Sequence, residues 1–170
     1  EPPMTSHGTG LSHIGHRANN EDYFLSIDGL GLYLVCDGMG GHAGGEVASA
    51  LAAGVIKQVI EEHFGVLTAV AEDRLSPSLL ESYAAVAMNA ANRAVHQCAA
   101  SNESLGGMGT TVTMLLVAGR YATVAHVGDS RLYHVRGGSA VQVTRDHTVA
   151  ADLRRTLVEC DIDLDDYEHL

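Results

Sequence analysis

Two short apolar stretches near the N-terminus flank the dipeptide Asp28-Gly29. The stretches 23–27 and 30–36 contain aromatic and β-branched residues, and each has the length of a strand. Asp-Gly between two such stretches favours a tight hairpin turn. We therefore predict an antiparallel hairpin, whose open end brings the start of the first strand beside the end of the second.

Two longer segments carry apolar residues at spacings of three and four, the period of a helix that packs on one face. The first runs from Glu46 to Phe64, and the second follows the helix-start signal Ser76-Pro77 and continues to Ala100. The spacing of Ser78 and Glu81 also matches a capping box. We interpret both apolar stripes as core and the residues between the helices as a looser segment.

From residue 109 the period of the pattern changes to two, which is typical of strands. The strand-like stretches are 109–117, 121–127, 131–135 and 141–143. Glycine turns join them, so the pattern predicts a meander of four strands. A weak alternation at 9–14 suggests an edge strand, and a third helical pattern covers 148–158.

Strands, two helices, more strands and a last helix follow one another in this order. Helices grouped apart from consecutive hairpins favour an α+β layered domain over alternating parallel βαβ units. The length of 170 residues fits one domain with a sizeable core.

The formal net charge is −11, which argues against a nucleic-acid-binding protein because such proteins need clustered lysine and arginine. The same charge repels an anionic substrate unless a bound cation or a local arginine attracts it. Any phosphate chemistry in this chain therefore requires local positive charge.

Cysteine is rare in the chain, and Cys36, Cys98 and Cys160 are widely spaced. Two of them lie in apolar runs, so we expect reduced thiols in an intracellular, cytoplasmic protein and no disulfide framework. The sequence has neither a signal-peptide pattern nor an apolar run long enough to span a bilayer. No membrane segment is therefore expected in this chain.

Acidic residues gather at strand ends and glycine turns. They are Glu21, Asp22, Asp37 and Asp129. Few basic residues are available to pair with them, so the cluster would repel itself without a cation. Carboxylate and carbonyl oxygens suit magnesium or manganese. The alternative is that the glycines after Asp37 only serve the tight geometry of a strand-to-helix turn.

The absence of several motifs argues against other kinds of site. No His-x-x-x-His or Cys-x-x-Cys spacing occurs, which argues against zinc. A Gly-x-Ser-x-Gly elbow and a glycine-rich Lys-Ser/Thr phosphate loop are absent as well. Arg17 is the notable cation near the acids, and a guanidinium typically grips a phosphate. Its alternative role is a surface ion pair with Glu21 or Asp22.

Five motifs occur in the order typical of one known family. They are Gly15-x-Arg17 followed by Asn20-Glu21-Asp22, Val35-Cys36-Asp37-Gly38-Met39-Gly40-Gly41-His42, Gly109-Thr110-Thr111, His126-Val127-Gly128-Asp129-Ser130-Arg131, and Thr144-Arg145-Asp146-His147. From about residue 9 to residue 158 the chain resembles the metal-dependent serine/threonine protein phosphatases of type 2C, the PPM family, in their bacterial form.

This resemblance implies a fold and a division of the chain. The fold is a four-layer α-β-β-α sandwich of two antiparallel sheets flanked by helix pairs, incomplete at the C-terminus. Residues 1–8 would be an N-terminal tail, and residues 9–170 the N-terminal part of a PPM-type phosphatase domain.

The resemblance also implies a role for each acid. Asp37 would bridge two divalent ions, Mn²⁺ or Mg²⁺, and the carbonyl oxygen of Gly38 would bind one of them. Glu21 and Asp22 would hold metal-bound waters. Asp129 resembles a ligand of a third, weaker metal.

The resemblance also implies a reaction. Arg17 would bind the substrate phosphate, and Arg17 and Asp37 would be the catalytic residues. A water held between the two metals would attack a phosphoserine or phosphothreonine in line. The expected partners are proteins phosphorylated by a serine/threonine kinase.

The chain departs from the family pattern after the Asp-Gly pair. Many relatives have histidine there as a candidate general acid, whereas Met39 cannot donate a proton. We interpret His42 as a loop histidine, so water would protonate the leaving hydroxyl.

A second departure concerns the acids that the family supplies after the Asp-His motif. The chain ends at Leu170 without those motifs, and we expect it to be the N-terminal two-thirds of a phosphatase and inactive alone. The alternative is a catalytically inactive, phosphatase-like regulatory or phosphoprotein-binding module. Acids at the end of the chain hint at a calcium loop, but the pattern lacks its glycine and favours a solvated segment. These acids are Asp161, Asp163, Asp165 and Asp166.

Overall fold

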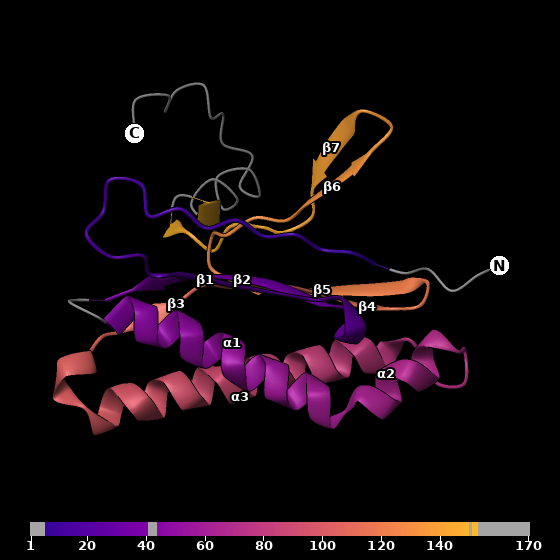
Figure 1. The fold of residues 1–170 in the computed structure, drawn as a ribbon, viewed down its shortest axis with the longest axis horizontal. Helices are drawn as coiled ribbons and strands as arrows, with labels where there is room; N and C mark the ends of the chain where they lie inside the picture. The colour runs from indigo at the N-terminus through magenta and orange to yellow at the C-terminus, as the bar shows by residue number, and fades with distance from the viewer. Residues whose placement is uncertain (1–5, 41–43, 150, 153–170) are drawn as a thin grey trace.

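The computed structural model describes residues 6–40, 44–149 and 151–152. This part of the chain forms three α-helices and two antiparallel sheets (Figure 1). The elements are β1 (Asp22–Ile27), β2 (Leu32–Met39), α1 (Gly44–Glu62), α2 (Phe64–Ala71), α3 (Ser78–Ser101), β3 (Gly109–Thr110), β4 (Val112–Ala118), β5 (Tyr121–Val127), β6 (Tyr133–Arg136) and β7 (Ser139–Gln142). The predicted mixture of helices and antiparallel sheets is therefore confirmed.

The larger sheet has the strand order β1-β2-β4-β5, and the short β3 pairs with the end of β2. All of its described pairings are antiparallel. The predicted hairpin forms β1 and β2, but the predicted tight turn at Asp28-Gly29 is wrong, because a single turn of 3-10 helix at Asp28–Leu30 joins the strands. Gly31 closes this turn in the left-handed conformation, where a side chain would be unfavourable.

The alternation in β2 explains why the sheet has one covered face. Leu32, Leu34 and Cys36 are buried, whereas the alternating residues Val35 and Asp37 are exposed. The buried row faces α1 and α3, which lie side by side on one face of the sheet (Figure 1). Their predicted apolar stripes are confirmed as core, and this layer fixes the face on which Asp37 projects.

The smaller sheet contains only the hairpin of β6 and β7, which stands on the other side of the larger sheet from the helices (Figure 1). The prediction of one meander of four strands is therefore wrong. β4 and β5 continue the larger sheet, but the chain leaves it at the turn 128–130 before β6 begins. Periodicity indicated strands in this region but cannot tell which of them pair.

Four local predictions are also wrong. Residues 9–14 form no strand, and the looser segment after Phe64 contains α2. The predicted strand 109–117 is interrupted at Thr111, which separates β3 from β4. The capping-box spacing is not used, since α3 has no side-chain hydrogen bond at its N-cap; the Ser76 and Ser78 hydroxyls instead lie 2.8 Å apart.

Several predictions lie outside the described residues. They concern His42, Cys160, the acidic segment at 159–168 and most of the helix predicted at 148–158. Within the described residues Cys36 and Cys98 are free thiols, as expected. None of the described helices combines the length and the hydropathy that a membrane span requires.

Candidate metal-binding site

The open end of the β1–β2 hairpin brings two carboxylates face to face. In the antiparallel register Asp22 lies directly opposite Asp37. The pairing continues one residue further, because the Gly38 amide donates a hydrogen bond to the Glu21 carbonyl at 3.1 Å. The prediction that the hairpin places Glu21 and Asp22 beside Asp37 is confirmed. Like charges that face each other across a strand pair are destabilising, so this arrangement needs another explanation than fold stability.

The surroundings of the Asp37 carboxyl group change its pKa. Partial burial raises the pKa of Asp37 above its ordinary value, and the charges of Asp22 and Asp129 raise it further. Arg17 lowers the same pKa. The charges of Asp22, Asp129 and Arg17 therefore all act on Asp37, although these residues come from separate parts of the sequence. A bound cation would relieve the excess of negative charge.

Glycine lets the backbone at the end of β2 approach the first turn of α1. A side chain at Gly38 would overlap the carbonyl groups of Gly45 and Glu21. A Cβ at Gly45 would lie 2.7 Å from the carboxylate of Glu21, so this carboxylate lies against the start of α1. The Glu21 side chain is therefore held at the helix, whereas Asp22 faces Asp37.

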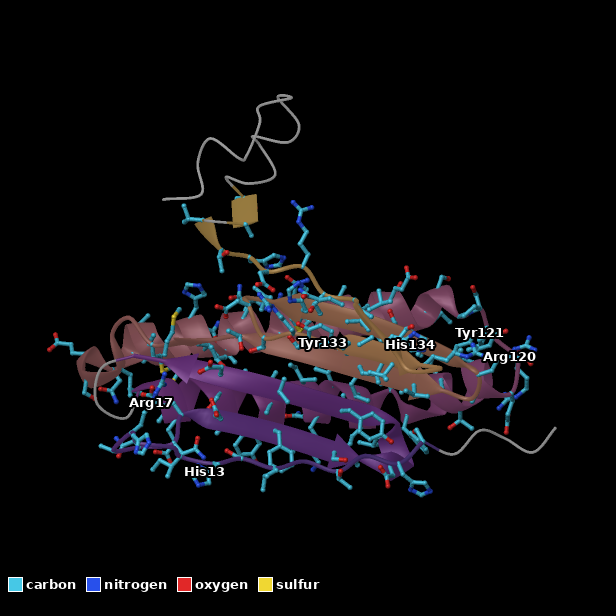
Figure 2. All side chains as sticks on the ribbon, turned by 90° about the horizontal axis from the view of Figure 1, so that it is seen from above. His13, Arg17, Arg120, Tyr121, Tyr133 and His134 are labelled. Carbon is cyan, nitrogen blue, oxygen red and sulfur yellow. The ribbon has the colours of Figure 1, made fainter. Side chains whose placement is uncertain are left out.

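Arg17 lies near the end of the sheet at which β2 ends (Figure 2). Its amide donates a hydrogen bond to the Ile14 carbonyl at 3.3 Å, which closes the turn that carries it. Among the described residues Arg17 has no ion pair with either Glu21 or Asp22. The exposed guanidinium thus remains available to an anion at this end of the sheet.

A hollow of about 220 Å³ opens beside the acids. Asp22, Asp37 and Ser130 line its polar side, and its apolar side includes Tyr23, Phe24 and Val35. Such a hollow admits a small polar group with part of the chain that carries it.

The residues at this end of the sheet fit a hard cation in part. Their donors are carboxylate and carbonyl oxygens, and magnesium is commonly held by one or two protein carboxylates together with water. Within the described ranges, no three histidine, cysteine, aspartate or glutamate side chains come together as a group that could hold a metal. The described residues thus supply facing carboxylates at Asp22 and Asp37 but no complete set of metal ligands.

Sequence reasoning did not assign any role to the hydroxyl groups around these acids. Thr111 and Ser130 link the Asp37 strand end to the turn that carries Asp129, with 2.7 Å between their hydroxyl oxygens. The motifs Gly109-Thr110-Thr111 and Gly128-Asp129-Ser130 were visible in the sequence. Their contact was not, because it depends on how β4 and β5 pair.

Comparison with known proteins identifies the class to which this fold and site belong. Residues 9–161 match the family model Protein phosphatase 2C, and the chain belongs to this family. The resemblance inferred from the motifs is thereby confirmed.

Similar proteins include bacterial serine/threonine phosphatases. The chain is 39% identical over 137 residues to the serine/threonine protein phosphatase PstP of Mycobacterium tuberculosis, covering 81% of this chain and 24% of PstP. It is 32% identical over 141 residues to the serine/threonine phosphatase stp of Listeria monocytogenes, covering 83% of this chain and 53% of that protein. The chain thus spans about half the length of the Listeria relative and about a quarter of PstP.

A solved structure supports the same assignment. The catalytic domain of the serine/threonine protein phosphatase PstP in complex with two manganese ions superimposes with a TM-score of 0.68 at 34% identity. The match covers 97% of this chain and 62% of that one.

Proposed function

We propose that the protein containing this chain is a metal-dependent phosphatase that hydrolyses phosphoserine and phosphothreonine on proteins. The observation that carries the proposal is the register of the hairpin, which sets Asp22 opposite Asp37. Family membership and the names of the relatives support the same activity. On this proposal, residues 9–170 are the N-terminal part of the phosphatase domain.

The acids would hold Mn²⁺ or Mg²⁺, in two ions and a third, weaker one. Asp37 and the Gly38 carbonyl would be direct ligands, Glu21 and Asp22 would hold waters on the ions, and Asp129 would bind the third. When bound, the ions supply an acidified water and neutralise charge on the phosphoryl oxygens. The raised pKa of Asp37, caused by burial and then by neighbouring acids, supports a site that is complete only with cations.

The protein residues would orient the substrate. Arg17 would grip the phosphoryl oxygens, since its side chain is exposed and forms no ion pair among the described side chains. The apolar wall that includes Phe24 and Val35 would contact the chain that carries the phosphate. Met39, exposed to 66%, has no proton to donate, so solvent water would protonate the leaving hydroxyl.

The substrates would be proteins phosphorylated by a serine/threonine kinase. Bacterial relatives named serine/threonine phosphatases support this class of substrate. A cytoplasmic location is supported by the free thiols of Cys36 and Cys98.

A second candidate function is a regulatory module that binds phosphoproteins without hydrolysing them. The partial ligand set favours it, because the described residues bring together no group of three metal-binding side chains. Such a module would still bind the phosphate group through Arg17 but would not hydrolyse it.

One experiment separates the two candidates. Hydrolysis of p-nitrophenyl phosphate and of a phosphothreonine peptide is measured with and without Mn²⁺, for the natural full-length protein and for the 170-residue chain. Manganese-dependent turnover by the full-length protein supports the phosphatase, and turnover by the longer protein alone shows that the 170 residues do not suffice. Binding of the phosphopeptide by both, with turnover by neither, supports the regulatory module and overturns the phosphatase.

A further inference from the structure

Thr111 holds the backbone of Asp37 from both sides. Its amide donates a hydrogen bond to the Asp37 carbonyl at 2.9 Å, and its hydroxyl oxygen accepts one from the Asp37 amide at 3.0 Å. Thr111 belongs to no strand, because it lies between β3 and β4. This break in the sheet turns the Thr111 side chain onto the chain segment that ends in the candidate ligand.

The same side chain contacts the turn that carries Asp129. Its hydroxyl lies 2.7 Å from the Ser130 hydroxyl, so the two share a hydrogen bond. Gly128 has a φ of +101°, and a Cβ there would lie 2.6 Å from the Thr111 methyl carbon. The turn therefore packs on the methyl group while it hydrogen-bonds to the hydroxyl group.

A single threonine thus joins two segments that the chain separates by about ninety residues. The hydroxyl accepts from the Asp37 amide and still has a proton to donate to Ser130. Thr113 strengthens the second half of the link, because its hydroxyl donates to the Ser130 carbonyl at 2.6 Å. Serine would supply the hydroxyl without the methyl contact, and valine the methyl contact without the hydroxyl.

We propose that Thr111 is a positioning residue that fixes the Asp129 turn relative to Asp37 and thereby sets the affinity of the acidic site for a divalent cation. The proposal rests on the proposed function, since it treats both aspartates as metal ligands. Partners that orient metal ligands commonly change metal affinity by about 10–100-fold when they are removed. Thr111 acts through Asp37 and the turn and does not itself touch an ion.

The first test measures Mn²⁺ binding by calorimetry in the 170-residue chain and its variants. We expect Thr111→Val to weaken Mn²⁺ binding about tenfold or more, and Thr111→Ser to stay within about threefold of the original chain. Thr123→Val is the matched control, because Thr123 pairs with Leu116 near the other end of β5. Thr111→Val that binds Mn²⁺ as well as the original chain overturns the proposal and leaves the proposed function intact.

The second test needs no metal and is hydrogen exchange at single amides in EDTA. Loss of the Thr111 hydroxyl removes the acceptor of the Asp37 amide, so Thr111→Val should speed exchange there at least tenfold. Exchange at Asp37 that does not change overturns the role of Thr111. If the original chain binds no Mn²⁺ and the full-length protein hydrolyses no phosphate, the proposed function fails, and this exchange result alone decides whether Thr111 positions Asp37.

Ser130→Ala tests the same link without altering Thr111, and it serves if Thr111→Val does not fold. It keeps the acceptor of the Asp37 amide and removes the hydrogen bond between the Thr111 and Ser130 hydroxyls. Weaker Mn²⁺ binding with protected exchange at Asp37 supports the proposal. Unchanged Mn²⁺ binding by a folded Ser130→Ala chain overturns it.

Discussion

Both ends of the larger sheet carry acidic residues, but the surroundings of these acids differ. At the turn end, Asp28 accepts hydrogen bonds from the Gly8 amide at 2.9 Å and the Tyr33 hydroxyl at 3.0 Å, and His7 lies 3.0 Å away. The hydrogen bond with His7, with those from Gly8 and Tyr33, lowers the pKa of Asp28. At the open end, Asp37 faces Asp22, and burial together with this acid raises its pKa.

Asp73, also at the turn end, has protein partners as Asp28 does. It accepts a hydrogen bond from the Tyr121 hydroxyl at 2.7 Å and lies 3.3 Å from the Arg120 guanidinium. Arg120 and Tyr121 lie at the opposite end of the molecule from Arg17 (Figure 2). Acids that have protein partners hold loops in place, whereas a bound cation would relieve the repulsion between acids that face one another, as Asp22 and Asp37 do.

The largest expected effect is the loss of catalysis on removing the charge of Asp37. Asp37→Asn in the full-length protein should lower kcat/KM for a phosphopeptide at least about 100-fold, because losing a ligand costs more than losing a group that orients one. Asp28→Asn makes the same change at the satisfied end and should stay within about twofold. Steady-state kinetics over a range of Mn²⁺ concentrations checks both variants. Equal loss in the two variants would mean that the ends of the sheet do not differ in function.

A smaller effect is expected from Arg17. Arg17→Ala should raise KM for the phosphopeptide about tenfold with little change in kcat, because it removes a contact made equally in the bound and transition states. That ratio corresponds to roughly 1.4 kcal/mol. Arg93→Ala is the control, since Arg93 is an exposed arginine on α3. An unchanged KM at saturating Mn²⁺ would remove Arg17 from phosphate binding.

The open end of the sheet could be predicted from sequence because its geometry is local. The Asp28-Gly29 turn and the apolar stretches beside it define one hairpin, and a hairpin fixes which residues oppose each other. A two-residue turn at Asp28-Gly29 would set Asp22 opposite Val35, whereas the longer turn through Leu30 and Gly31 sets it opposite Asp37. The sequence therefore predicted which strand ends meet but not the exact pairing. The motif order then identified the family, which the family model confirms over residues 9–161.

The features missed from sequence depend on contacts between distant segments. α2 is short and follows α1 after a break at His63, so its sequence alone did not distinguish it from a loop. The β6–β7 hairpin, which forms a sheet of its own, is held at its base by the Arg131–Asp146 ion pair at 2.6 Å and by the Val143 amide, which donates to the Leu132 carbonyl at 2.8 Å. The link from Thr111 to Ser130 likewise exists only once β4 and β5 lie side by side.

The smallest expected effect concerns stability without metal, and it has opposite signs at the two ends. A raised pKa means that folding penalises ionised Asp37, so the penalty is absent below the ordinary pKa of 3.8 and is complete above the raised value. Asp37→Asn should therefore stabilise the metal-free chain at pH 7 by roughly 0.5 kcal/mol, the scale of a like-charge pair across strands. Its advantage should disappear at pH 3.

Asp28 titrates in the other direction. Because its pKa is lowered, its stabilising effect is complete above pH 3.8 and is lost as the pH falls through the lowered value. Asp28→Asn should thus destabilise the chain at pH 7 and have little effect at the most acidic pH at which the chain stays folded. Urea unfolding in EDTA from pH 3 to pH 7 measures both variants. Destabilisation by Asp37→Asn at pH 7 would contradict the comparison, because it would mean that the facing acids stabilise the fold as the partnered acids do.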